Sequence, residues 1–169
     1  LAAAGLGPAD LGAVLVTHEH ADHASGVATL ARRARVPVGA TAGTWRGMAL
    51  APDGRDFVVA PDARLRLGPL EIDAVTVPHD ANEPVQYVLS HGRGRLGVLT
   101  DLGHPTPHVA ARYGGCDALV LEANHDPQML AEGRYPPALK RRVGGRFGHL
   151  SNDQAAELLA QLATGSLQH

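Results

Sequence analysis

Four potential metal ligands lie within six residues, directly after an apolar segment. The stretch VLVTHEHADHASG places His18, His20, Asp22 and His23 immediately after the apolar run that ends at Thr17. Clustered imidazole and carboxylate groups beside a buried strand repel one another or lose solvation unless a cation lies among them. The chain has 10 histidines but only 2 Phe and 1 Trp, and imidazole is the commonest metal ligand. The cluster therefore indicates a metal centre.

The spacing of this block suggests how it divides between two ions. In an extended segment His18 and His20 point to the same side and can hold one ion. Asp22 and His23 follow a change of chain direction and can reach a second ion. Zinc accepts imidazole nitrogen and carboxylate oxygen, and a carboxylate such as Asp101 can bridge two ions. Two ions about 3.5–4 Å apart generate a bound hydroxide and stabilise the attacking and leaving oxygens of a phosphoryl displacement.

Further polar side chains follow other apolar segments of the chain. His79 follows IDAVTVP, Asp101 follows LGVLT, and Glu122, Asn124 and His125 follow DALVL. If these strands lie side by side in one sheet, their ends converge at one edge. Polar groups carried by loops can then meet there.

Composition limits the class of protein. A chain of 169 residues is the size of one domain, and its net charge of -2 excludes a globally basic protein that coats nucleic acid, although not a local basic patch. The single cysteine, Cys116, excludes an intrachain disulfide framework. No apolar run approaches the roughly 20 residues that span a bilayer. We therefore expect a cytoplasmic protein without membrane association.

The elements that must position these residues can be read from apolar periodicity. Strands are predicted at residues 13–17, 36–40, 56–60, 64–67, 70–77, 85–90, 95–100 and 117–123. Helices are predicted at 25–34, 42–50, 106–113, 126–132 and 136–142, with a last amphipathic helix after Ser151. The Ala-rich start is expected to be the tail of a helix that ends at Gly5 or Gly7. Hairpins mixed with helices predict a layered α/β domain.

Five sequence blocks together resemble a known family. THEHADH resembles the signature of the metallo-β-lactamase superfamily, and VPHDA, LTDLG, LEANHD and GHLSNDQA follow in the order of its WalJ/YycJ-like branch. This branch lies near RNase J, tRNase Z and the PhnP-like cyclic phosphodiesterases. The resemblance implies an αββα sandwich, a dinuclear zinc or manganese centre, and hydrolysis of phosphodiester bonds in DNA, RNA or a small cyclic phosphate.

The resemblance also implies a ligand set. His18, His20 and His79 would hold the first metal, Asp22 and His23 the second, and Asp101 would bridge them. The opening strands of the family and its last ligand histidine have no counterpart in residues 1–169, and His169 would only begin the strand that carries that ligand. We therefore expect these residues to form an incomplete domain that binds its second metal weakly.

Other residues are candidates for proton transfer and substrate binding. By the resemblance, His149 in the GHLS block protonates the leaving alkoxide, and Asp22 is expected to orient it. Arg142 and Arg146 belong to a basic run at 140–146, which is either a solvated helix end or a phosphate-binding rim. Asn124 and His125 (with Glu122) either form a network under the site or contact substrate.

Three functions follow from these observations. The leading hypothesis is a metal-dependent phosphodiesterase, in particular a nuclease that acts from a strand end on nucleic acid. The second is a thioester or lactam hydrolase of the same fold, which would have no proton-donating histidine in the loop at 144–149. The third is a non-catalytic zinc-binding module. The sequence leaves a homodimer open.

Overall fold

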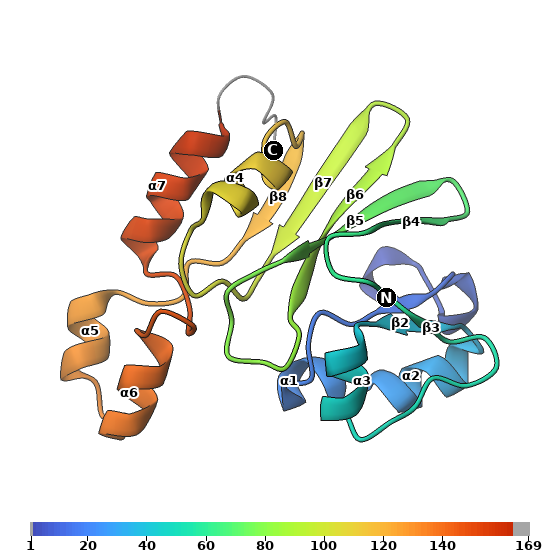
Figure 1. The fold of residues 1–169 in the computed structure, drawn as a ribbon, viewed down its shortest axis with the longest axis horizontal. Coiled ribbons are helices and arrows are strands. Elements are labelled where there is room, and N and C mark those ends of the chain that lie inside the picture. Colours follow the sequence, from blue (N-terminus) through green and yellow to red (C-terminus); the bar gives the residue numbers. More distant parts are fainter. Residues whose placement is uncertain (1, 164–169) are drawn as a thin grey trace.

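The computed structural model describes residues 2–163, and within them eight strands form two sheets (Figure 1). The first sheet is parallel and contains β1 (Val14–Leu15), β2 (Val38–Ala40) and β3 (Phe57–Val58). The second contains β4 (Arg64–Leu67), β5 (Leu70–Thr76), β6 (Val85–His91), β7 (Gly94–Leu99) and β8 (Ala118–Leu121). Its pairs are antiparallel except for the parallel pair β7–β8.

Seven α-helices connect and cover the sheets in the described part of the chain. They are α1 (Ala21–Ala24), α2 (Val27–Ala34), α3 (Ala42–Gly47), α4 (Pro107–Tyr113), α5 (Pro127–Glu132), α6 (Pro137–Val143) and α7 (Asn152–Leu162). None of the helices within residues 2–163 is long and apolar enough to cross a membrane. The expected helix tail at the start is a single 3₁₀ turn, Ala2–Ala4, which ends before Gly5 at a positive φ of 69°.

Apolar clusters fill the spaces between the layers. Val27 of α2, Val38 of β2 and Trp45 of α3 belong to the cluster between the first sheet and its helices. Ile72 of β5 and Tyr87 of β6 belong to the cluster between the two sheets, together with partly buried side chains of β1 and β3. The two sheets therefore pack against each other, with helices on the outer side of the first.

The second sheet is covered by helices on its other face. Val75 and Val88 from the sheet pack with Tyr113 of α4 and Leu158 of α7 in a third cluster. Along β5 the side chains alternate between the two faces, so that Ile72 joins the inner cluster and Val75 the helix-covered one. This arrangement confirms the predicted αββα sandwich.

The strands that precede the candidate ligands do not share one sheet, which corrects the expectation from the sequence. Strand β1 has only two residues and pairs with β2, whereas β5, β7 and β8 belong to the second sheet. The strand ends still meet, because the N–H of Val85 donates to the carbonyl of Thr17 at 3.0 Å. The hydroxyl of Tyr87 also donates to the carbonyl of Val16 at 3.0 Å. These bonds join the end of β1 to the start of β6.

Candidate metal centre

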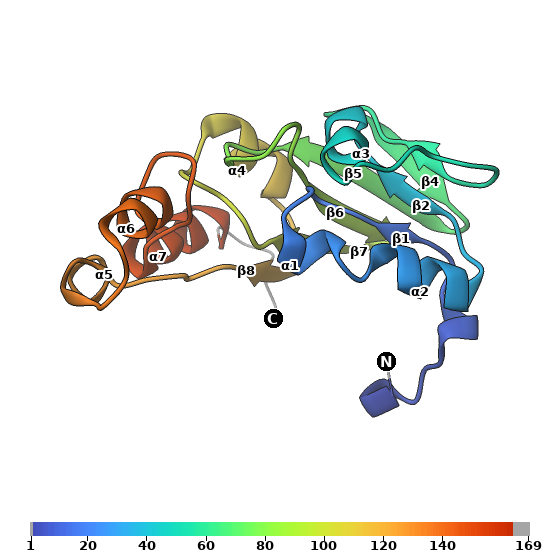
Figure 2. The same cartoon turned by 90° about the horizontal axis from the view of Figure 1, so that it is seen from below.

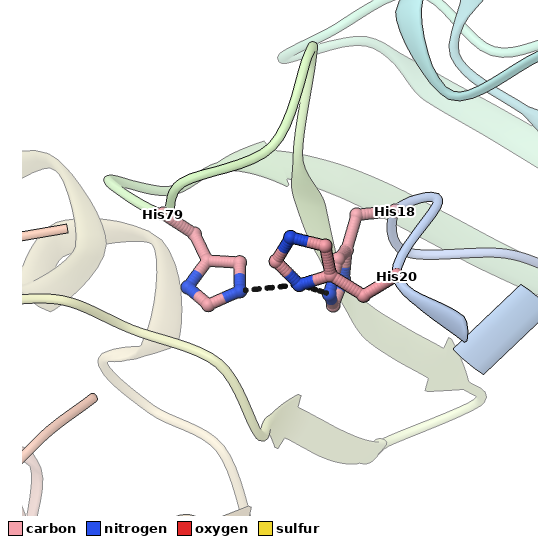
Figure 3. Close-up of side chains that lie close together, drawn as sticks. All are labelled: His18, His20 and His79. Carbon is pink, nitrogen blue, oxygen red and sulfur yellow. Dashed lines mark hydrogen bonds between the residues drawn. The ribbon is translucent and has the colours of Figure 1, made fainter. Parts of the chain in front are cut away.

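Three imidazoles from two loops converge at this junction (Figure 3). His18 and His20 follow β1, and His79 follows β5. His18 Nε2 lies 2.9 Å from His20 Nδ1, which lies 3.3 Å from His79 Nε2. The candidate ligand nitrogens of the three residues all lie within 4.8 Å of one another. The positions of these residues after strand ends predict that they meet, and the structure brings them together.

The second nitrogens of two of these rings have neighbours that orient them. His18 Nδ1 lies 3.0 Å from Thr17 Oγ1, and His79 Nδ1 lies 3.0 Å from the carbonyl of Gly148, to which it can donate. Burial, followed by the charge of His23, lowers the pKa of His18 to about 3, and burial also lowers the pKa of His79. Burial therefore favours the neutral form of both rings, and because His79 Nδ1 faces a carbonyl, His79 Nε2 presents a lone pair toward the centre of the cluster.

A second group shares His18 and adds a carboxylate. It consists of His18, His23 and Asp101, whose candidate ligand atoms also lie within 4.8 Å of one another. His23 Nε2 is 3.3 Å from Asp101 Oδ2, which accepts a hydrogen bond of 2.9 Å from Thr100 Oγ1. The carboxylate of Asp22 lies 3.5 Å from His23 Nε2, but its side chain is 80% exposed, and it belongs to neither group.

The donor chemistry of the two groups fits a metal ion. Imidazoles, together with a buried carboxylate, are ligands that zinc and other first-row divalent ions accept. The structure thus brings five of the six predicted ligands into the two groups, and Asp22 lies outside both.

His149 lies beside the centre and has its own carboxylate partner. Its Nδ1 is 2.9 Å from Glu122 Oε2 and 3.7 Å from Asp101 Oδ1, and its ring centroid is 5.3 Å from that of His79. The hydrogen bond to Glu122 raises the pKa of His149. Asp22, which was predicted to orient this ring, does not contact it, and Glu122 occupies that position. The signal for Glu122 was its place after β8, at the same edge as Asp101.

Close backbone packing fixes the loop that carries His149. A Cβ on Gly148 would lie 2.1 Å from the carbonyl of Arg142, and a Cβ on Gly103 would lie 2.2 Å from the carbonyl of Arg146. The N–H of Asp80 donates to the carbonyl of Phe147 at 2.9 Å. The segments that carry His79, Asp101 and His149 are therefore held against one another, and glycine is needed where their backbones approach most closely.

The candidate substrate-binding residues are not all at the centre. Arg142 Nε donates to Asp80 Oδ2 at 2.6 Å, and its guanidinium lies 3.3 Å from His20 Nε2, so this arginine is at the rim. Arg146 is exposed near it in the chain. Asn124 is also exposed, and its N–H donates to the carbonyl of Leu150 at 3.1 Å. His125 instead lines a groove between α5, α6 and α7.

Asp80, the residue after His79, also lies beside the imidazole cluster. The structure places its Oδ1 3.6 Å from both His20 Nε2 and His79 Nε2. The pKa of Asp80 is lowered, because its hydrogen bond with Arg142 and the charge of that residue outweigh the effect of burial. Asp80 therefore couples the basic end of α6 to the imidazole cluster.

Comparison with known proteins gives relatives along nearly the whole chain. The exodeoxyribonuclease YycJ of Bacillus anthracis is 35% identical over 164 residues, which cover 95% of this chain and 62% of that protein. The exodeoxyribonuclease WalJ of Streptococcus pneumoniae is 33% identical over 158 residues, which cover 90% of this chain and 59% of the relative. The chain thus spans about three fifths of the length of these curated relatives.

Solved structures agree with the fold. The crystal structure of Zn²⁺-bound PqqB from Methylobacterium extorquens matches with a TM-score of 0.70 and 23% identity, over 90% of this chain and 58% of that one. The model of the family described as "Beta-lactamase superfamily domain" matches residues 2–167. Together with the YycJ and WalJ relatives, this match shows that the chain belongs to the metallo-β-lactamase superfamily.

Proposed function

We propose that this chain carries the active centre of a metal-dependent phosphodiesterase that removes nucleotides from an end of a DNA strand. The observation that carries the proposal is the convergence of His18, His20 and His79 beside Asp101 and the His149–Glu122 pair. The exodeoxyribonuclease relatives support the choice of DNA as the substrate.

The proposed centre takes two divalent ions, with zinc as the first choice and manganese as the second. We assign the ligands as follows: His18, His20 and His79 to the first ion, Asp22 and His23 to the second, and Asp101 to both. Ions bound there supply Lewis acidity toward a phosphoryl oxygen and lower the pKa of water.

The residues around this centre have separate tasks in the proposed reaction. His149 donates a proton to the alkoxide that leaves when the phosphodiester bond breaks. Glu122 raises the pKa of His149, which favours the protonated ring, and engages its Nδ1, which leaves Nε2 to face the leaving oxygen. Arg142 lies at the rim, where its charge attracts a phosphate that approaches the imidazoles. Arg146 is placed with it, as a second cation near the entrance.

The His149–Glu122 pair also bears on the alternative functions. A thioester or lactam hydrolase of this fold was expected to lack a proton-donating histidine in the loop at 144–149. A non-catalytic zinc-binding module gives no role to a histidine that lies beside the centre, belongs to neither ligand group and pairs with its own carboxylate. The pair therefore favours phosphodiester hydrolysis. We also propose a cytoplasmic protein, and a homodimer stays a prediction to be tested.

Metal analysis combined with three substrates tests this function. The purified chain, loaded with Zn²⁺ or Mn²⁺, is assayed with bis-p-nitrophenyl phosphate, with single-stranded DNA labelled at either end, and with a chromogenic lactam. We expect hydrolysis of both phosphodiesters, stepwise shortening of the DNA, and loss of both activities on chelation. Turnover of the lactam without turnover of either phosphodiester would refute the proposal.

A further inference from the structure

A groove separate from the metal centre lies where α5, α6 and the start of α7 gather at one end of the molecule (Figures 1 and 2). Its volume is about 760 Å³, and its polar lining includes His125, Lys140 and Arg141. Leu130 and Pro137 contribute apolar surface to the same groove. Volumes of this size are typical of sites that hold ligands.

The charge of the groove selects an anion. Lys140 and Arg141 contribute positive charge, and none of the described residues that line the groove is an aspartate or glutamate. Lys140 Nζ donates to the carbonyl of Ala131 at 2.6 Å, so the ammonium is held at the wall between α6 and α5. Two cations without a neighbouring carboxylate in the lining attract phosphate groups.

A polar atom in the wall of this groove has no partner. His125 Nδ1 is buried and makes no hydrogen bond with the described residues. An unpaired buried nitrogen lowers stability, so the wall of the groove contains a polar atom whose hydrogen-bonding capacity the described residues do not use.

Helix α6 connects the groove to the metal centre. Lys140 and Arg141 line the groove, whereas the next residue, Arg142, pairs with Asp80 beside His20. Three consecutive cations of one helix turn are therefore divided between two adjacent sites. A chain of regularly spaced phosphates can contact both sites at once, which a single small phosphodiester cannot do.

We propose that this groove binds the backbone phosphates of single-stranded DNA on the nucleotides next to the scissile bond. The inference rests on the proposed function, which places the end of that strand at the metal centre. The groove thereby makes the site prefer strands over small phosphodiesters. Positively charged grooves that follow the backbone are the usual way in which proteins hold single strands.

The test measures DNA binding as a function of salt. The probe is a fluorescein-labelled single strand of about ten nucleotides, and its binding to the metal-loaded protein is measured by stopped-flow anisotropy, before hydrolysis intervenes. The variant is Lys140→Gln with Arg141→Gln. The matched control is Arg32→Gln with Arg33→Gln, which neutralises two exposed cations in the last turn of α2. The single variant Arg141→Gln, at an exposed position, serves if the double variant does not fold.

The expected result follows from counterion release. Each phosphate contact on a single strand contributes about 0.7 to the slope of log K against log salt. Loss of two contacts lowers that slope by about 1.4, so between about 50 and about 200 mM salt the wild type loses about sevenfold more affinity than the groove variant. We expect the control to keep the wild-type slope, and Arg141→Gln to show half of the change.

The outcomes separate this inference from the proposed function. Equal slopes for the wild type, the groove variant and the control overturn the groove, even if the wild type hydrolyses DNA. A change of slope confined to the groove variant supports the groove, even if no phosphodiester is hydrolysed, in which case the proposed function fails by itself. Tighter binding of an RNA strand of the same sequence, with the same loss in the groove variant, overturns the assignment to DNA.

Discussion

His149→Ala is the change that most directly tests how the centre works. If His149 protonates the leaving alkoxide, its loss removes general acid catalysis, which contributes about 10²–10⁴-fold to the rate. The effect depends on the leaving group, because p-nitrophenolate departs without protonation whereas a deoxyribose alkoxide does not. We therefore expect a loss within that range for DNA and a much smaller loss for bis-p-nitrophenyl phosphate.

Glu122→Gln tests the partner of this histidine. The charge-assisted hydrogen bond of 2.9 Å to His149 Nδ1 belongs to a class worth about 1.5–3 kcal/mol. If this energy acts in the transition state, its loss lowers kcat on DNA by about ten- to a hundredfold. Because Glu122 raises the pKa of His149, activity should fall as pH rises through that pKa, and the fall should move to lower pH in the variant.

Both variants are measured by initial rates on the two substrates across pH, with metal content determined by mass spectrometry on the same samples. Metal content should equal that of the wild type, because His149 belongs to neither group of candidate ligands. Equal losses on DNA and on the p-nitrophenyl ester would contradict proton donation. Loss of metal in His149→Ala would show instead that the histidine is a ligand.

Further predictions concern metal affinity and stability. His79→Ala should lower the affinity for the first ion by more than the 10–100-fold that is typical when a residue hydrogen-bonded to a ligand is replaced. Calorimetric titration of the wild type should show that the second ion binds with lower affinity than the first, because Asp22 is exposed and lies outside both ligand groups. Leu158→Ala should lower the free energy of unfolding by about 2–5 kcal/mol, because Leu158 is fully buried. Denaturant titration measures this loss, and a smaller value would show that the helix layer is loosely packed. The hydrogen bond from Arg64 lowers the pKa of Asp73 in the folded protein. The ionised carboxylate therefore stabilises the fold above the pKa of about 3.9 that Asp73 has in the unfolded chain, and this stabilisation is lost as the pH falls through the pKa of the folded state. Asp73→Asn should therefore destabilise the protein at pH 7 and do so much less in acid, and an equal loss at both pH values would count against this ion pair.

The fold was predictable where a segment is long and its apolar residues are periodic. The alternation along β5, with Ile72 and Val75 on opposite faces, is visible in the sequence and is confirmed by the packing. The assignment of strands to two sheets was not predictable, because β1 has only two residues and its partner is fixed by pairing with distant Val38. Helix α1 was missed, because its four residues form part of the ligand block and show no apolar stripe.

The same distinction applies to the site. Local spacing made His18 and His20 recognisable, and their position after a strand end extended the prediction to His79. The pairing of His149 with Glu122 depends on the path of the loop at 144–149, which is determined by backbone contacts and not by periodicity. Helical phase likewise decides which cation of α6 reaches the centre, and it is Arg142.

The three imidazoles come from loops that follow strands of two different sheets, and this affects how the sheets are held together. A cation held by His18, His20 and His79 would tie together segments about sixty residues apart, in addition to the apolar cluster between the sheets and hydrogen bonds such as that between Thr17 and Val85. Removal of the cation should then weaken the contact between the two sheets before either sheet unfolds. Proteases and hydrogen exchange should detect this opening first in the loop that follows β5.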